Sequence, residues 1–299
     1  MTEISCVMPT YNRSDMVTQA LAALLKQSYA GAFEVVIVDD GSSDNTREVI
    51  AEFIAQHDRD RVRWVYLHQE HRGPAAARNK GVTGSQGEYV VFLGDDMLAG
   101  ADFLKEHLNL LRKDDKIISL GLVSWHPRAG NPRLKVFNIT GIEVDYERMS
   151  DTDNCDFNYF CTANVALKRK HLLEERFDED FLFPALEDTE LGYRLHKRGL
   201  VVKLNKKSRV YHFHHYEVEN LFKRQENIGL SLALLIRKHP QLREKFLKPY
   251  AYPLYLLCSF LSMLRPLRHV NLDFYWSAVA IASKYRAFYR ALDTSGARR

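Results

Sequence analysis

The stretch YVVFLGDD (residues 89–96) decides the fold class, because a run of five apolar, β-forming residues ends abruptly in two adjacent carboxylates. A short, wholly apolar run is typical of a strand buried on both faces, as in parallel sheets. Ligands of open α/β sheets bind at the carboxyl ends of such strands. Carboxylate oxygens there suit Mg²⁺ or Mn²⁺, and such a cation suits a phosphate. From this stretch alone, a metal site and a plain acidic turn are both consistent with the residues.

The segments around this stretch alternate between the hydrophobic period of β-strands and that of α-helices. Pro9 ends the first apolar run, Ser14 or Asp15 is expected to cap the first helix, and Asp44 the second. Strands are expected at 4–8, 33–38, 63–67 and 89–93, and helices at 16–25, 46–57 and 74–82. This rhythm predicts an α/β fold with a doubly wound, mostly parallel sheet.

The rhythm loosens after residue 100. Residues 126–158 are polar and irregular, and we interpret them as a loop-rich insertion that faces the site. Helices are expected at 102–112 and 188–198, strands at 117–124 and 163–167, and extended segments at 201–204 and 209–212.

The composition is that of a globular protein, with 46% hydrophobic and 27% charged residues in a chain of 299. The net charge of +4 is too small to indicate a nucleic-acid partner, but its sign suits an anionic substrate or membrane surface. The four cysteines show no CxxC spacing and are expected to be reduced thiols. The N-terminus lacks the pattern of a signal peptide, so we expect a cytoplasmic location.

The C-terminal segment 250–292 is unusually apolar and aromatic. Its first part, 250–264, is roughly 15 residues long and falls short of the ~20 needed to span a bilayer. Its second part, 273–292, interleaves aromatic residues with Lys284, Arg286 and Arg290. The segment therefore suits either an interfacial helix pair at a membrane or a helical hairpin packed on the main domain or in a dimer.

Two loops that follow the first and second strands offer groups that a nucleotide needs. Tyr11 could support a base, Asp40 could accept from a ring N–H or ribose hydroxyl, and a metal at Asp96 could bind phosphates. The glycine-rich phosphate-binding patterns GxGxxG and GxxxxGK[ST] are absent from these places. The small-residue helix GPAAARNKG (73–81) carries Arg78, which could reach a carboxylate or phosphate.

The segments MPTYNR (8–13), VDDGSSD (38–44), GPAAARNKG (73–81) and FLGDD (92–96) together resemble the family-2 inverting glycosyltransferases of the GT-A fold, over about residues 3–215. The resemblance implies a nucleotide-sugar donor and Mn²⁺ or Mg²⁺. It further implies that Pro9, Tyr11 and Asp40 contact the nucleoside, Arg78 lines the donor site, Asp95 touches ribose or sugar, and Asp96 binds the metal. The chain departs from the family at Gly94, where a further Asp is common, so fewer carboxylates are expected around the metal.

The segment EDTELGYRL (187–195) begins a helix with Glu187 and Asp188, and a helix N-terminus favours an ionised acid. By resemblance this is the family's Glu-Asp motif and Asp188 is the general base; otherwise Asp188 is a helix cap with Glu190 as its partner. Resemblance also suggests His212 as a metal ligand, and Asn164 as a contact to sugar or acceptor.

The resulting hypothesis is a metal-dependent inverting transferase, with a UDP-sugar favoured over a GDP-sugar as donor and a sugar, lipid or other hydroxyl as acceptor. Residues 1–215 would form the catalytic domain, with a nucleotide-binding half (1–100) and an acceptor half (101–215). Residues 216–299 would form a helical extension. The open alternatives are a polyprenyl-phosphate glycosyltransferase at the inner face of the plasma membrane, and a non-catalytic nucleotide-sugar-binding module. Peripheral membrane contact through 250–292 and a homo-oligomer also stay open.

Overall fold

The computed structural model describes residues 2–57, 61–127, 146, 149–213, 218–264 and 272–294. The chain divides into two compact units. The first comprises residues 1–129, 145–182 and 188–214, and the second comprises 130–144, 183–187 and 215–299.

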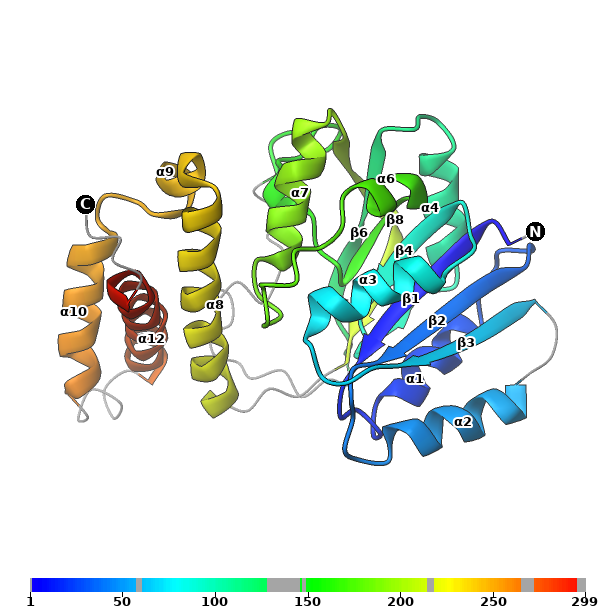
Figure 1. The fold of residues 1–299 in the computed structure, drawn as a ribbon, viewed down its shortest axis with the longest axis horizontal. Helices are drawn as coiled ribbons and strands as arrows, with labels where there is room; N and C mark the ends of the chain where they lie inside the picture. The colour runs from blue at the N-terminus through cyan, green and yellow to red at the C-terminus, as the bar shows by residue number, and fades with distance from the viewer. Residues whose placement is uncertain are drawn as a thin grey trace. The chain divides into compact units, whose positions relative to one another are not determined.

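The first unit is built on a sheet whose strands, among the described residues, follow the order β3-β2-β1-β4-β7-β6-β8-β5 (Figure 1). Strands β1 to β4 are mutually parallel where they pair, and β6 and β8 are parallel to each other. Strand β7 is antiparallel to both β4 and β6, and β5 is antiparallel to β8. The prediction of a mostly parallel α/β sheet is confirmed. The strands are β1 (Ile4–Thr10), β2 (Phe33–Asp39), β3 (Val62–His68), β4 (Tyr89–Leu93), β5 (Met97–Ala99), β6 (Ile117–Trp125), β7 (Asn164–Lys168) and β8 (Val201–His212).

Helices cover both faces of this sheet. One face packs against α1 (Val17–Leu24), α2 (Thr46–His57) and α4 (Phe103–Leu111). The other packs against α3 (Pro74–Gly84), α6 (Arg169–Glu174) and α7 (Glu187–Lys197). The alternation of side chains along each strand divides them between the two cores, because successive residues point to opposite faces. In β4, Val91 belongs to the first core and its neighbour Phe92 to the second.

The helix starts show where the local sequence predicts hydrogen bonding correctly and where it does not. Helix α2 begins as predicted, with Asp44 Oδ1 accepting from the Thr46 N–H at 3.0 Å. The predicted caps of α1, Ser14 and Asp15, were wrong: the capping position is Met16, and its side chain makes no capping hydrogen bond. Ser14 instead donates from its backbone N–H and its hydroxyl to Asp44 Oδ2, at 3.2 and 2.9 Å. Asp44 therefore joins the loop after β1 to the start of α2.

Two expectations for the later part of the chain need adjustment. The two extended segments expected at 201–204 and 209–212 are one strand, β8, whose register against β6 shifts between Gly121 and Leu122. Of the loop expected at 126–158, residues 128–145 and 147–148 lie outside the described residues, while 149–156 are irregular and lead into a 3₁₀ turn, η2 (Phe157–Tyr159).

The second unit is helical. It contains α8 (Val218–Lys238), η3 (Pro240–Leu242), α9 (Arg243–Phe246), α10 (Ala251–Met263) and α12 (Leu272–Thr294). Helix α12 packs against α8 through a cluster around Phe288, and against α10 through a cluster around Cys258 and Ala278 (Figure 1). Among the described residues, no helix has the length and apolar character needed to cross a membrane.

Candidate active site

The sequence-predicted donor residues converge on one edge of the sheet in the first unit. Strands β1, β2 and β4 are parallel, so the loops that follow them leave the sheet at the same edge. Strands β6 and β8 end at that edge too, because β7 runs antiparallel to both β4 and β6. Pro9 lies near the end of β1, in register with Val38 of β2.

Asp96 and His212 form the centre of this edge. The Asp96 Oδ2 and His212 Nε2 atoms are 3.0 Å apart, and their side chains are 15% and 7% exposed. The pairing of β5 with β8 sets Met97 opposite His212, and the Phe213 N–H donates to the Asp96 carbonyl at 2.8 Å. The Trp125 ring stacks on the His212 imidazole with centroids 4.6 Å apart. Two residues 116 positions apart in the sequence are therefore held together by strand pairing and stacking.

This pair fits a divalent cation that is shared with a substrate. Neighbouring ligands of an octahedral ion with bonds of about 2.1 Å lie about 3 Å apart, which is close to the separation of the Asp96 and His212 atoms. Within the described part of the chain, no group of three or more His, Cys, Asp and Glu side chains is placed to hold a metal. The remaining ligands would be phosphate oxygens and water, as is usual for Mg²⁺ in sites that bind nucleotides.

Asp95 is held by the last residue of β1 and by the loop that follows it. The Thr10 hydroxyl donates to Asp95 Oδ2 at 2.7 Å, and the Arg13 Nε lies 4.0 Å from the same oxygen. Burial, together with the adjacent Asp96 carboxylate, raises the pKa of Asp95 to about 7. A cation at Asp96 would oppose the effect of the Asp96 charge.

Gly94, where the chain departs from the family pattern, lies against the Asp96 carboxylate. A Cβ atom at Gly94 would lie 2.9 Å from Asp96 Oδ1 and 3.2 Å from the Met97 Cγ. A side chain at this position would therefore require a shift of the Asp96 carboxylate or of a neighbouring group. The glycine at this position is compatible with an intact Asp96–His212 pair.

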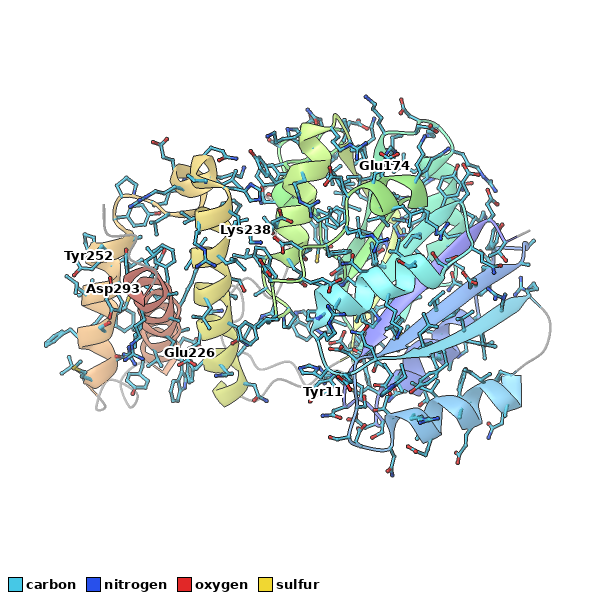
Figure 2. All side chains as sticks on the ribbon, in the orientation of Figure 1. Tyr11, Glu174, Glu226, Lys238, Tyr252 and Asp293 are labelled. Atoms are coloured by element: carbon cyan, nitrogen blue, oxygen red, sulfur yellow. The ribbon has the colours of Figure 1, made fainter. Side chains whose placement is uncertain are left out.

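Tyr11 forms an aromatic stack at the outer side of the same edge (Figure 2). Its ring stacks on the His71 imidazole with centroids 4.2 Å apart, and its side chain is 42% exposed. The neighbouring Asn12, in the left-handed region with φ of 52°, accepts from the Ser43 N–H at 2.8 Å. The loop after β1 is therefore tied to the loop after β2, and the stack presents an aromatic face that a base could cover.

Asp40 lies behind this stack and organises the loop after β3. It is 4% exposed, and its Oδ1 accepts from the Gln69 side chain at 2.7 Å and the Arg72 N–H at 2.9 Å. Its Oδ2 accepts from the Gly73 N–H at 2.9 Å and lies 2.9 Å from His71 Nδ1. Asp40 thus holds His71 under Tyr11, while its direct contact with a nucleoside stays a prediction.

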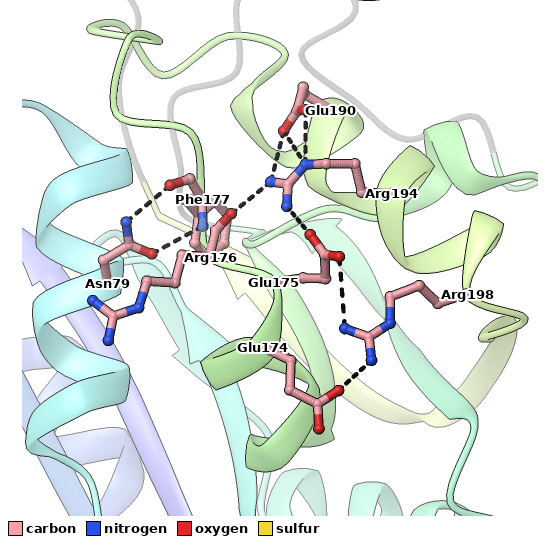
Figure 3. Close-up of polar contacts among 8 residues, drawn as sticks. All are labelled: Asn79, Glu174, Glu175, Arg176, Phe177, Glu190, Arg194 and Arg198. Atoms are coloured by element: carbon pink, nitrogen blue, oxygen red, sulfur yellow. Dashed lines mark hydrogen bonds and ion pairs between the residues drawn. The ribbon is translucent and has the colours of Figure 1, made fainter.

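Arg78 is carried by α3 and is 8% exposed, with its guanidinium 5.5 Å from the centre of the Phe177 ring. The next residue, Asn79, exchanges hydrogen bonds of 2.9 Å with the backbone N–H and carbonyl of Phe177 (Figure 3). Helix α3 is therefore fixed to the segment between α6 and α7.

An ionic network fixes the same segment to α7 (Figure 3). Arg194 donates from Nε to Glu190 Oε1 at 2.8 Å, and it also pairs with Glu175. Arg198 pairs with Glu174 and lies 3.6 Å from Glu175 Oε1. Glu190 bonds Arg194 one turn further along the helix. Its role as the capping-box partner of the alternative interpretation stays a prediction.

Asp188 lies in the first turn of α7, half-buried, and its Oδ1 accepts from the Thr189 N–H at 2.7 Å. The helix N-terminus stabilises the ionised carboxylate. Glu187 beside it is 2% exposed, and the preceding Leu186 has a φ of 64°, which bulky residues rarely adopt. Such backbone strain is found most often at functional sites.

Asn164 requires a correction. Its side chain is fully buried and belongs to the interior of the sheet. Its Oδ1 lies 2.8 Å from His107 Nε2, and its Nδ2 donates to the Leu122 carbonyl at 3.0 Å and the Ser208 carbonyl at 3.3 Å. Since both ends of the amide are occupied inside the protein, Asn164 is a structural residue rather than a contact for sugar or acceptor.

The structure also adds residues that the sequence analysis missed. His71 and Gln69 follow β3 at the same edge, and Trp125 ends β6 there. The polar run HQEHRG (68–73) directly after an apolar strand was the available signal. Trp125 offered no comparable signal, because its role depends on the position of His212 beside it.

Comparisons with known proteins agree with this geometry. The profile of glycosyl transferase family 2 matches residues 5–175, more than half of the chain. Validoxylamine A glucosyltransferase from Streptomyces hygroscopicus subsp. jinggangensis (strain 5008) is 29% identical over 275 residues, covering 80% of this chain and 61% of that protein. Chondroitin synthase from Escherichia coli is 28% identical over 273 residues, covering 81% of this chain and 39% of that protein. The chain thus spans less than two thirds of the length of these relatives.

Solved structures share the fold at low sequence identity. The mannosyltransferase PcManGT from Pyrobaculum calidifontis, in complex with GDP-Man and Mn²⁺, has a TM-score of 0.66 and 18% identity, covering 97% of this chain and 87% of that one. S. aureus TarS 1-349 in complex with UDP has a TM-score of 0.56 and 18% identity, covering 99% and 92%. The fold is therefore GT-A, and by its match to the family profile the chain belongs to glycosyl transferase family 2.

Proposed function

We propose that this protein is a metal-dependent, inverting glycosyltransferase that moves a sugar from a nucleoside-diphosphate sugar to a hydroxyl acceptor in glycoconjugate or polysaccharide synthesis. The observation that carries the proposal is the pair of Asp96 Oδ2 and His212 Nε2, 3.0 Å apart at the carboxyl edge of the sheet. The first unit would be the catalytic domain, with Glu187 and Asp188 as its candidate catalytic acids.

Each donor group has a candidate partner at this edge. The Tyr11–His71 stack would support the base, and Asp95, held by Thr10, would face the ribose or sugar. Arg78 would line the donor site from α3. A UDP-sugar is the donor we favour, since TarS was crystallised with UDP, although PcManGT was crystallised with GDP-Man.

In the proposed reaction, Asp96 and Asp188 have different tasks. A divalent cation held by Asp96 and His212 would neutralise charge on the diphosphate leaving group. Asp188, kept ionised by the N-terminus of α7, would remove the proton from the acceptor hydroxyl. The acceptor oxygen would attack the anomeric carbon from the face opposite the diphosphate, forming the new glycosidic bond as the bond to the diphosphate breaks, so the configuration inverts.

A thermal-shift panel of UDP- and GDP-sugars, with and without Mn²⁺, tests the donor and the metal together. We expect one nucleotide to raise the melting temperature only when Mn²⁺ is present, because ligands that bind the folded state stabilise it. Asp96→Asn should abolish the Mn²⁺-dependent part of the shift. Glu88→Gln is the matched control, because Glu88 lies just before the opposite end of β4 and is exposed.

The reaction itself is tested with the donor that the panel identifies. Release of the nucleoside diphosphate should depend on Mn²⁺, and proton NMR of the transfer product should show an inverted anomeric centre. Donor binding without metal-dependent turnover would instead indicate a binding module, and a retained anomeric configuration would exclude the inverting mechanism.

A further inference from the structure

Helix α10 has an apolar face that no element among the described residues of the second unit covers. The helix comprises 13 residues, Ala251–Met263, and none of them is charged. Its inner side packs on α12 through Cys258, with Leu254 and Leu261 beside it. The large side chains of its outer side are exposed, with exposed fractions of 51–71% for Leu256, Leu257, Phe260 and Met263.

A helix that is apolar on every side is normally buried in a core or placed in a membrane. The exposed residues Tyr252, Leu256, Phe260 and Met263 recur at helical spacing and therefore share one stripe. Single exposed apolar residues are ordinary, but a contiguous stripe of this kind marks an interaction surface. We call the outer side of α10, formed by Tyr252, Leu256, Leu257, Phe260 and Met263, the α10 outer face.

Positive charge is concentrated in the part of the sequence that contains this helix. Residues 240–299 contain ten Lys and Arg against three Asp and Glu, whereas residues 1–239 contain 32 against 35. The C-terminal sixty residues thus carry a net charge of +7 in a protein whose total is +4. Tyr252, labelled in Figure 2, also lines a cavity of about 380 Å³ together with Arg286, Arg290 and Asp293 of α12. Two cationic side chains and one carboxylate therefore border this end of the α10 outer face.

We propose that the α10 outer face docks on an anionic lipid bilayer. At 13 residues the helix is about 20 Å long, too short for a hydrocarbon core of about 30 Å, so it would lie in the plane of the interface. Its apolar side chains enter the boundary of the acyl chains, and Arg286 and Arg290 face the lipid phosphates. A second copy of this chain is a poorer occupant, because a two-fold contact through this face brings two strongly basic surfaces together.

The test is flotation of the complete 299-residue protein with phosphatidylcholine vesicles and with equimolar phosphatidylcholine and phosphatidylglycerol vesicles. We expect binding to the anionic vesicles only, weakening as salt is raised. Leu257→Glu with Phe260→Glu should lower the partition coefficient at least tenfold. Leu173→Glu is the matched control, because Leu173 is an exposed leucine on α6 in the first unit and should leave binding unchanged. Arg286→Gln with Arg290→Gln should weaken binding several-fold and flatten its salt dependence.

Two further measurements keep the proposal falsifiable. Light scattering reports whether Leu257→Glu with Phe260→Glu converts an oligomer to a monomer; that result with unchanged vesicle binding would assign the face to a second copy and overturn the proposal. An environment-sensitive dye at Met263→Cys, in a Cys161→Ser background, should shift to the blue with anionic vesicles, and no shift would also overturn it. The donor-induced thermal shift should be unchanged in all these variants. A failure of the membrane-docking proposal can therefore be distinguished from a failure of the proposed function.

Discussion

The two halves of the sheet differ in how they bring their functional residues together. In the parallel half, β1 to β4, each donor-side group follows its own strand, and neighbouring loops meet because neighbouring strands are parallel. In the mixed half, β5 to β8, His212 reaches Asp96 through strand pairing over 116 residues. The first arrangement follows from local order along the chain, while the second depends on tertiary pairing.

The mixed half is also held by a buried polar network. The parallel half has a different one at the opposite edge of the sheet, where the Ser5 hydroxyl donates to Glu34 Oε2 at 2.6 Å. His107 of α4 contacts the Ser119 hydroxyl and the Asn164 amide, at 2.8 Å each, and Asn205 donates to the Glu106 carbonyl at 2.8 Å. A fully satisfied network of this kind favours one arrangement of the strands over others. Its expected role is to keep β6, β7 and β8 in the register that positions His212.

The largest expected effect is a loss of catalytic rate without a loss of donor binding. Asp188→Asn should lower kcat by about 10³-fold while leaving donor affinity unchanged, because it removes the general base and no donor contact. Single-turnover transfer and donor titration measure the two quantities. Retained turnover would remove Asp188 as the base, and lost donor binding would place it in the donor site instead.

The next effect concerns the stability of the mixed half. Asn164→Leu should lower the free energy of unfolding by about 3 kcal/mol, because it leaves buried partners of Asn164 without hydrogen bonds. A Cβ at Gly121 would lie 2.2 Å from Asn164 Nδ2, so Gly121→Ala should also destabilise the protein. In an Asn164→Ala background, Gly121→Ala should cost much less. Additive costs in urea unfolding would contradict this close packing.

A third effect is the pH dependence that His107 contributes. Burial lowers the pKa of His107 to about 4, so the folded protein keeps the imidazole neutral where the unfolded chain begins to bind a proton. The stabilising contribution is therefore complete above about pH 6.5 and is lost as the pH falls toward 4. At pH 5 the loss should be about 2 kcal/mol.

The difference in urea unfolding between the wild type and His107→Gln, followed from pH 7.5 to 4.5, measures this loss. The difference is needed because Asp95, with its raised pKa, titrates in the same range with the opposite effect on stability in both proteins. His107→Gln should flatten the dependence, because glutamine does not titrate in this range. An identical slope in the wild type and the variant would show that His107 is not the group responsible.

The smallest expected effect is on donor binding and comes from a residue of the parallel half. Tyr11→Leu should weaken donor binding about tenfold with kcat little changed, because base stacking on an aromatic ring contributes on the order of 1–3 kcal/mol. His57→Ala is the matched control, since His57 stacks on Phe53 with centroids 4.3 Å apart, away from the carboxyl edge of the sheet. Equal losses in both variants would indicate a general destabilisation instead of a lost base contact.

Much of the parallel half could be predicted from the sequence. The apolar runs ending at Leu93 and Val38 set the strands, and α2 begins at Thr46 as expected, with its first N–H bonded to Asp44. Prediction failed where the side chain forms a hydrogen bond with a residue far away in the sequence. Ser14 bonds Asp44 instead of capping α1, and Asn164 bonds His107 instead of facing the site. Neither partner is visible in the local pattern.

The sequence by itself determined the strand–helix rhythm, the family and the residue types at the carboxyl edge, because burial of alternating side chains is a local property that periodicity records. The tertiary structure decided the reversed direction of β7, the meeting of Asp96 with His212, and the buried role of Asn164. These depend on packing between segments far apart in the chain, which local propensity does not encode. Gly94 joins the two levels: the family resemblance marks it as a departure, and in the structure a Cβ atom there would lie 2.9 Å from Asp96 Oδ1.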